Sequence, residues 1–318
     1  MPTLTETVIR RQFPYWQAAL GQSLPNVKAT CVVVTGCGTS YYLAQTLACA
    51  FNAHGQRAIA VPGAEWTRRP ECYLADPAGV LVIGLSRSGT TSETVQAIQA
   101  SRARGWRTLA LSCEPGSAIL AAAQDAVCLP TDPDEGIVMS VSASLMLLAG
   151  LRMAGVDLQG SVATAAAKAL IALDAGLDAL LPGRSHFVYL GAGVQYGIAT
   201  EGGLKLQEMS LSYSQSFHPM EYRHGPVSLI DARSLVVLLY SSDTAAEEAV
   251  LATELQAKGA VVIGVNGPGD LSISTGQNDA ANALACLPAL QLLGEKVALH
   301  KGINSETPRH LTKVVVLP

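Results

Sequence analysis

The sequence is poor in charge and has no basic run. Charged residues make up 14% of the chain and aromatic residues 5%, and the formal net charge is −4. Proteins that bind nucleic acid or anionic membranes need a basic surface, so we exclude both kinds of partner. The longest apolar stretch, residues 137–151, is interrupted by three serines and is too short to span a bilayer. The N-terminus also lacks the apolar core of a signal peptide.

Cysteine pairs of the C-x-x-C type are missing. The seven cysteines are odd in number, scattered and mostly in apolar contexts. This pattern is typical neither of a disulfide framework nor of a zinc site. We therefore expect a protein of the reduced cytoplasm without a bound metal.

The sequence also lacks a nucleotide-binding signature. Two G-x-G motifs follow predicted strands, but Tyr41 and Tyr196 stand where a dinucleotide fingerprint has its third glycine. No Asp or Glu closes the second predicted strand, near residues 57–61, to hold a ribose, and no G-x-x-x-x-G-K-[ST] occurs. We expect no cofactor.

Apolar β-prone runs alternate with helical stretches, and 49% of the residues are hydrophobic. This alternation is typical of parallel sheets covered by helices. Three landmarks of the first half recur after 154 or 155 residues, Gly36 at Gly191, Leu81 at Leu235 and Gly105 at Gly259. Such constant spacing predicts an internal duplication. The predicted fold is therefore α/β, with two doubly wound, five-stranded parallel sheets flanked by helices.

The predicted organisation has four parts. Residues 1–26 form a helical arm, and residues 27–155 form the first α/β domain. The alanine-rich residues 156–184 connect it to a second domain, residues 185–318, whose polar C-terminal tail returns over a site. We expect Lys313 to begin a last strand in that tail.

Residues 81–94 pass from an apolar strand into a hydroxyl-rich turn. Thr90 and Glu93 have the spacing of a capping box at the start of a helix. Such a turn directs backbone N–H groups and the hydroxyls of Ser86, Ser88 and Thr91 toward one point, which suits a phosphate. An ordinary capped turn between strand and helix is an equally good interpretation of this stretch alone. Arg87 favours the phosphate, because a guanidinium suits a bound dianion.

The second half carries a charged helix followed by a polar loop. Glu201, Lys205 and Glu208 lie on one face of the predicted helix, which by itself is more often a solvated face. Glycines at 202 and 203 indicate close approach by another backbone or a ligand. His224 follows in a loop bounded by glycine and proline, and these neighbours distinguish it from an incidental histidine.

Together these stretches resemble the SIS (sugar isomerase) family, in particular the isomerase half of glutamine–fructose-6-phosphate amidotransferase and its stand-alone deaminase relatives. The resemblance covers nearly the whole chain from about residue 27. The motifs that carry it are Gly36-Cys37-Gly38-Thr39-Ser40, Ser86-Arg87-Ser88-Gly89-Thr90-Thr91, residues 201–208, Arg223-His224-Gly225-Pro226 and Pro308-Arg309-His310-Leu311-Thr312-Lys313.

The resemblance implies a role for each motif. Glu208 would move a proton between C1 and C2 of the sugar, and His224, supplied by the neighbouring subunit of a homodimer, would open the ring. Lys205 and Lys313 would contact the open sugar, Lys313 also as a candidate for an imine, and Glu201 belongs to the same catalytic group. The residues assigned to binding of the phosphate and sugar are Cys37, Gly38, Thr39, Ser40, Ser86, Arg87, Ser88, Thr91 and Glu135.

Three departures from the family pattern bear on the reaction. The chain begins Met1-Pro2 and soon enters the sugar domain, so we expect no glutaminase with an N-terminal cysteine. Arg87 stands where the amidotransferase has glutamine, and a basic residue usual near Ser142 is missing. We expect a deaminase of the glucosamine-6-phosphate type. The alternatives are a phosphosugar aldose–ketose isomerase, a deglycase for glycated amino-acid phosphates and, as another class, a non-catalytic sugar-phosphate sensor.

Overall fold

A computed structural model describes residues 2–317, and the chain enters each of two structural units twice. We call residues 12–158 with 312–317 the N-domain, and residues 2–11 with 159–311 the C-domain. Each domain therefore contains one terminal segment of the chain in addition to its central part.

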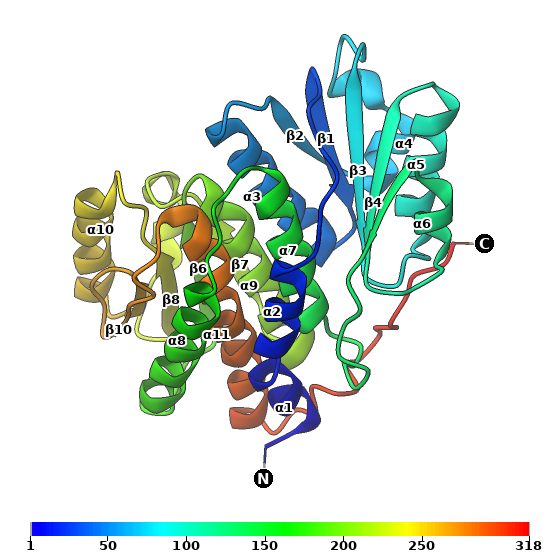
Figure 1. Ribbon diagram of the computed structural model, residues 1–318. Helices are drawn as coiled ribbons and strands as arrows, with labels where there is room; N and C mark the ends of the chain where they lie inside the picture. Colours follow the sequence, from blue (N-terminus) through cyan, green and yellow to red (C-terminus); the bar gives the residue numbers. More distant parts are fainter. Residues whose placement is uncertain (1, 318) are drawn as a thin grey trace. The chain divides into compact units, whose positions relative to one another are not determined.

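The N-domain sheet has five parallel strands in the order β2-β1-β3-β4-β5 (Figure 1). The strands are β1 (Cys31–Gly36), β2 (Ala58–Pro62), β3 (Val80–Ser86), β4 (Arg107–Ser112) and β5 (Asp125–Cys128). β1 and β3 are buried along their whole length, as expected for a sheet covered on both faces. Because β1 pairs directly with β3, the turns that follow these two strands lie at the same edge of the sheet.

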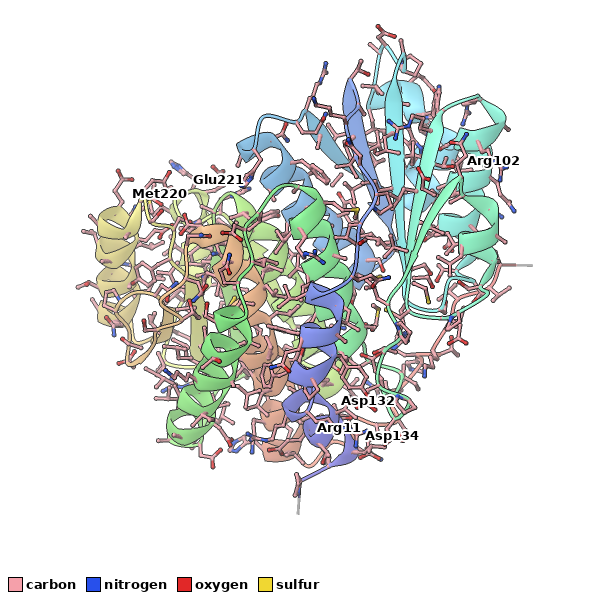
Figure 2. The ribbon with its side chains drawn as sticks, viewed as in Figure 1. Arg11, Arg102, Asp132, Asp134, Met220 and Glu221 are labelled. Carbon is pink, nitrogen blue, oxygen red and sulfur yellow. The ribbon has the colours of Figure 1, made fainter. Side chains whose placement is uncertain are left out.

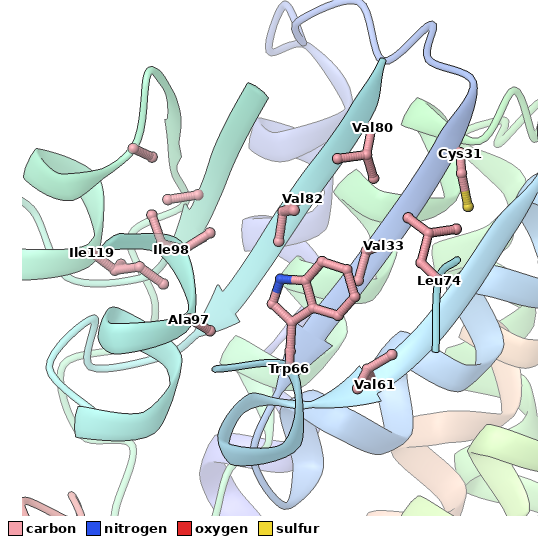
Figure 3. Packing of buried hydrophobic residues seen from close by; sticks show 12 residues of the cluster. Cys31, Val33, Val61, Trp66, Leu74, Val80, Val82, Ala97, Ile98 and Ile119 are labelled. Carbon is pink, nitrogen blue, oxygen red and sulfur yellow. The ribbon is translucent and has the colours of Figure 1, made fainter. Parts of the chain in front are cut away.

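Helices cover both faces of this sheet. One face carries α4 (Gly63–Arg68), α5 (Ser92–Ala103) and α6 (Ala118–Ala122), with the short turn η1 (Pro70–Cys72). The other carries α3 (Thr39–Ala53), against which α7 (Val141–Met153) packs, and α2 (Phe13–Leu20) packs on α7. The indole of Trp66 lies in the core between the sheet and the first of these helical layers (Figure 3). Its N–H donates to Ser101 Oγ at 2.9 Å, so the large buried ring leaves no polar group unsatisfied.

The C-domain sheet is again parallel and five-stranded, with the order β10-β9-β8-β6-β7. The strands are β6 (His186–Gly191), β7 (Ser214–Phe217), β8 (Ser234–Leu239), β9 (Val261–Val265) and β10 (Leu271–Ile273). In both domains the first strand lies between the second and the third, and the fourth and fifth follow outward. The two sheets confirm the predicted fold.

The C-domain sheet also has helices on both faces. α10 (Ala245–Ala257) packs on one face, where Tyr222 is wholly buried in the core. α9 (Val194–Ser210) packs on the other face and is covered by α11 (Asp279–His300), which in turn contacts α8 (Ser161–Leu177) and α1 (Leu4–Arg10). The short turns η2 (Glu221–Arg223) and η3 (Pro226–Leu229) lie in the loop between β7 and β8.

The units differ from the predicted domain boundaries at the two ends of the chain. The predicted arm divides between α1 in the C-domain and α2 in the N-domain, and the break precedes Pro14, which lies in the first turn of α2. Residues 312–317 group with the N-domain instead of the second domain. The predicted last strand is wrong, because residues 314–317 form none. They lie along the start of α5, where the N–H of Ser92 donates to Val315 O at 3.4 Å.

Within the described part of the chain, no helix combines the length and the apolar character that a membrane span needs.

Candidate functional site

The turn after β3 brings two of the predicted phosphate-binding hydroxyls together, those of Ser86 and Thr91. Ser86 ends the strand, and its Oγ accepts from the N–H of Gly89 at 3.1 Å and lies 3.4 Å from Thr91 Oγ1. Gly89 has φ +62°, and a Cβ there would lie 2.0 Å from Ser117 Oγ, so only glycine fits. The turn is therefore a fixed loop of hydroxyls at the carboxyl end of the sheet.

The predicted capping box is wrong. α5 begins at Ser92, and its N-cap is Thr91, whose side chain makes no capping hydrogen bond. The hydroxyl of Thr90 instead donates to Ser88 Oγ at 3.2 Å. The helix starts one residue too late for Thr90 to cap it, because the left-handed glycine at 89 extends the turn.

The turn after β1 lies beside the turn after β3, at the same edge of the sheet. α3 begins at Thr39, directly after Gly38 with φ +55°, and Thr39 and Ser40 are each 4% exposed. The Sγ of Cys37 lies 3.5 Å from Thr94 Oγ1. Burial raises the pKa of the Cys37 thiol, which keeps it protonated at neutral pH and unsuited to act as a nucleophile. We call the turns 36–40 and 86–91 together the cradle.

Glu135 and Lys313, both predicted site residues, lie in the N-domain with Arg87. Glu135 is 2% exposed, and its carboxylate accepts the backbone N–H groups of Ser140 at 2.6 Å and Ser142 at 3.0 Å. These N–H groups lie at the start of α7, so Glu135 caps that helix and compensates its dipole. Its carboxylate is thus engaged in the fold, whereas its main-chain oxygen accepts from Lys313 Nζ at 2.8 Å.

The C-domain holds the predicted catalytic carboxylates on α9. Lys205 is wholly buried, with its Nζ 3.5 Å from the buried Glu201 carboxylate and in contact with Glu208 Oε2. Glu208 is the only one of the three that reaches solvent, with a side chain 20% exposed. The contact holds the Glu208 carboxylate in one orientation against an ammonium that is itself buried.

The glycines of α9 allow this helix to lie close to its neighbours. A Cβ on Gly202 would come within 2.9 Å of the Tyr189 ring and 3.0 Å of Leu290, and one on Gly203 within 2.9 Å of Ser216 Oγ. The sequence predicted close approach by another backbone or a ligand, but the neighbours are side chains of β6, α11 and β7. Because α9 lies this close to the sheet, the positions of Lys205 and Glu208 relative to the sheet are fixed.

His224 lies on the surface of the C-domain. It follows η2, and its backbone N–H donates to Glu221 O at 3.0 Å. The neighbouring Tyr222 is wholly buried, which raises the pKa of its hydroxyl to about 12, whereas Glu221 is exposed (Figure 2). The buried tyrosine anchors the loop, and Gly225 with φ +125° turns the chain after the histidine. The loop therefore presents an exposed imidazole from a rigid base.

The C-domain also contains the turn that corresponds to residues 86–91, but carboxylates of the same chain fill it. Asp279 accepts from both the N–H and the Oγ of Ser242, at 3.1 and 2.9 Å. Glu248 accepts the N–H of Ser241 at 2.8 Å, and burial raises the pKa of its carboxyl. The constant spacing of the landmarks located this turn in the sequence. It did not indicate that Asp279 fills the turn, because Asp279 lies 37 residues beyond Ser242.

A pocket of about 330 Å³ opens beside this second turn. Its lining includes Tyr240, Ser242, Asn266, Ser274 and Asp279, and it contains no Lys, Arg or His. A pocket whose only charge is a carboxylate repels a phosphate. This pocket is therefore unsuited to an anion.

Comparison with known proteins gives one family and several relatives. The SIS domain family matches residues 27–154 and 180–281. The chain is 28% identical over 320 residues to glutamine–fructose-6-phosphate aminotransferase of Zymomonas mobilis, and 27% over 312 residues to that of Pyrobaculum aerophilum. Each alignment covers 90% of this chain but only 52% and 51% of the relative, so the chain spans about half the length of these proteins.

Two solved structures are similar over almost the whole chain. Glucosamine-6-phosphate deaminase from Thermotoga maritima has a TM-score of 0.87 and 29% identity, covering 99% of this chain and all of that one. Tagatose-6-phosphate ketose/aldose isomerase from Escherichia coli has a TM-score of 0.82 and 26% identity, covering 99% and 96%.

Proposed function

The chain belongs to the SIS domain family, and from that premise we propose that it converts an aminosugar 6-phosphate to a ketose 6-phosphate with release of ammonia. The substrate class comes from the similarity to a deaminase along the full length of both chains. The groups proposed to act are the hydroxyls and backbone N–H groups of the cradle and Lys313 in the N-domain, and Lys205, Glu208 and His224 in the C-domain.

The observation that carries this proposal is the ion pair between Lys205 and Glu208. A base that moves a proton between two carbons must be ionised and held in one orientation. The buried ammonium of Lys205 holds the Glu208 carboxylate in one orientation, and the exposed part of Glu208 can reach a substrate. Glu201, wholly buried one turn before Lys205, adds a second carboxylate that holds the ammonium in place.

In the proposed reaction, His224 transfers a proton between the C1 hydroxyl and the ring oxygen, which opens the sugar to its aldehyde. Glu208 removes the proton on C2, and the resulting enolamine takes that proton back at C1. The product of this transfer is the imine of the ketose. Water adds to the imine carbon, ammonia leaves, and a ketose 6-phosphate remains. Atoms balance with one water consumed and one ammonia released.

The cradle would hold the phosphate of this substrate. The hydroxyls of Ser86 and Thr91 lie together, and Ser88 belongs to the same turn, at the edge where Thr39 and Ser40 begin α3. Hydroxyl and backbone N–H donors at the start of a helix are favourable partners for a phosphate dianion. The corresponding turn in the C-domain is filled by Asp279, so we propose one phosphate site per chain.

We propose a homodimer in which His224 serves the substrate bound by the partner, as the family resemblance implies. Its exposed position on an anchored loop supports this role. The seven cysteines are all free thiols, which supports a location in the reducing cytoplasm.

A second candidate is the interconversion of an aldose and a ketose phosphate without loss of nitrogen. The similarity to tagatose-6-phosphate ketose/aldose isomerase favours it, and the identity to that protein is only slightly lower. The same base and ring-opening group would serve, because the enediol replaces the enolamine and no water is consumed.

The test is a panel of glucosamine-, galactosamine-, fructose- and tagatose-6-phosphate, with ammonia release and ketose formation followed together. We expect ammonia and ketose in equal amounts from an aminosugar, and a fall of about a hundredfold or more in kcat for Glu208→Gln. Full turnover by Glu208→Gln would contradict the assignment of the base. Isomerisation without ammonia would select the second candidate. Tight binding of a sugar phosphate without turnover would indicate a sensor instead of an enzyme.

A further inference from the structure

The guanidinium of Arg87 connects two segments that are far apart in the chain. The Arg87 side chain is buried, with the residue 8% exposed. Its Nη1 donates to Gly136 O at 3.0 Å, and its Nη2 donates to Ile137 O and to Lys313 O, both at 2.9 Å. One planar, permanently charged fork thus joins the loop before α7 to the C-terminal tail.

Lys313 makes the return contact. Its Nζ donates to Glu135 O at 2.8 Å, so the tail and the loop are joined once through Arg87 and once through Lys313. We call the five residues Arg87, Glu135, Gly136, Ile137 and Lys313 the clasp. The resemblance made Arg87 a phosphate ligand and Lys313 a group that contacts the sugar, but in the clasp they contact one another.

The loop side of the clasp is rigid. Asp132 and Asp134 begin this loop (Figure 2), and the N–H of Asp134 donates to Asp132 Oδ1 at 2.9 Å. The carboxylate of Glu135 caps α7. The carbonyl oxygens that Arg87 binds therefore directly follow a residue tied to the start of α7, and Arg87 connects the tail to that segment.

The far side of the tail is held less firmly. Beyond Lys313, Val315 O accepts from the N–H of Ser92 at 3.4 Å, and the N–H of Leu317 donates to Ser92 Oγ at 2.9 Å. Ser92 is the first residue of α5, directly after the cradle turn. The charge-assisted bonds that Arg87 and Lys313 Nζ make in the clasp are stronger than these neutral ones, so the clasp is the main attachment of the tail at Lys313.

We propose that Arg87 is a positioning residue that holds the C-terminal tail, and with it Lys313, at the cradle, and that it is not a ligand of the phosphate. The inference deepens the proposed function, because it concerns the residue expected to contact the open sugar. It assigns phosphate recognition to the hydroxyls and N–H groups of the turn, and assigns the placement of Lys313 to Arg87.

The test compares Arg87→Gln with Ser88→Ala, a substitution in the same turn. Two measurements need no turnover, namely inorganic phosphate binding by calorimetry and tryptic cleavage after Lys313 followed by mass spectrometry. We expect Arg87→Gln to bind phosphate within about threefold of the wild type and to be cleaved after Lys313 at least about tenfold faster. Ser88→Ala should show the opposite pattern, with weaker phosphate binding and a protected tail.

Turnover then separates positioning from a general effect on the fold. We expect Arg87→Gln to lower kcat by about tenfold to a hundredfold with KM nearly unchanged, because a small displacement of a reacting group costs that much. In a Lys313→Ala background the further loss from Arg87→Gln should be less than about threefold. A loss of phosphate affinity of about thirtyfold or more in Arg87→Gln, with the tail still protected, would overturn the proposal. If no substrate is turned over, the proposed function fails, and the phosphate and cleavage measurements still decide on the clasp.

Discussion

Lys205 is wholly buried and pairs with Glu208, whose side chain is 20% exposed. The pair is asymmetric, since the cation is inaccessible and only the carboxylate can meet a ligand. Burial of an ion is costly unless its partners are well placed, and Lys205 has Glu201 at 3.5 Å as a second partner.

Removing the ammonium should therefore destabilise the C-domain strongly. For Lys205→Met we expect a loss of about 3–5 kcal/mol in the free energy of unfolding, because buried carboxylate charge loses its compensation. Urea unfolding of the variant and the wild type measures this loss. The matched control is Lys168→Met on α8, an exposed lysine, which should change stability by less than about 0.5 kcal/mol. Equal effects of the two substitutions would contradict the importance of the pair.

The two corresponding turns predict different effects of the same substitution. Ser88→Ala removes a hydroxyl from the cradle, and we expect inorganic phosphate to bind about tenfold to a hundredfold more weakly, the effect of one hydrogen bond to a charged group. Ser242→Ala removes a hydroxyl that already serves Asp279, so phosphate affinity should stay the same. Calorimetry on both variants decides the matter. Weaker binding by Ser242→Ala would place a phosphate in the C-domain.

The glycine at 202 should be intolerant of a side chain. A Cβ there would lie 2.9 Å from the Tyr189 ring and 3.0 Å from Leu290, both rigidly packed. We expect Gly202→Ala to cost about 1–3 kcal/mol of stability by forcing α9 away from the sheet. Gly160→Ala is the control, because no heavy atom lies within 4 Å of its added Cβ. A cost as large for Gly160→Ala would show that the crowding at 202 is not the cause.

The ion pairs that Asp174 makes with α1 and α11 should make the stability depend on pH. Asp174 on α8 binds Arg10 of α1 at 2.5 Å and Lys296 of α11 at 3.0 Å. Burial raises the pKa of Asp174, but hydrogen bonds from Lys296 and Arg10 outweigh it and hold that pKa below its ordinary value of 3.8. A carboxyl whose pKa is lower in the folded state stabilises the fold above its unfolded pKa, and the contribution disappears as the pH falls through the folded value.

Asp174→Asn should therefore lower the free energy of unfolding by about 1 kcal/mol at neutral pH, as a partly exposed ion pair does. The difference from the wild type should shrink as the pH falls below about 4. Urea titrations at pH 7, 4 and 2.5 measure it. A difference independent of pH would show that Asp174 acts through packing instead of charge.

The sequence by itself determined the class of fold and the strands, turns and helix that carry the candidate site. Alternating apolar runs and helical stretches are local properties, and the constant spacing of Gly36 and Gly191 needs only counting. Ser86, Ser88 and Thr91 lie in one turn directly after a strand, so their nearness in space is also a local matter. Glu201, Lys205 and Glu208 share a helix, whose period brings them to one face.

Only the tertiary structure decided what these residues contact. Asp279 reaches Ser242 across 37 residues, and Lys313 reaches Arg87 across 226. No local pattern encodes such contacts, because they result from packing the loops that leave different strands of one sheet. The same packing took the tail out of the predicted strand and onto α5, and turned Arg87 from an expected phosphate ligand into an attachment for that tail.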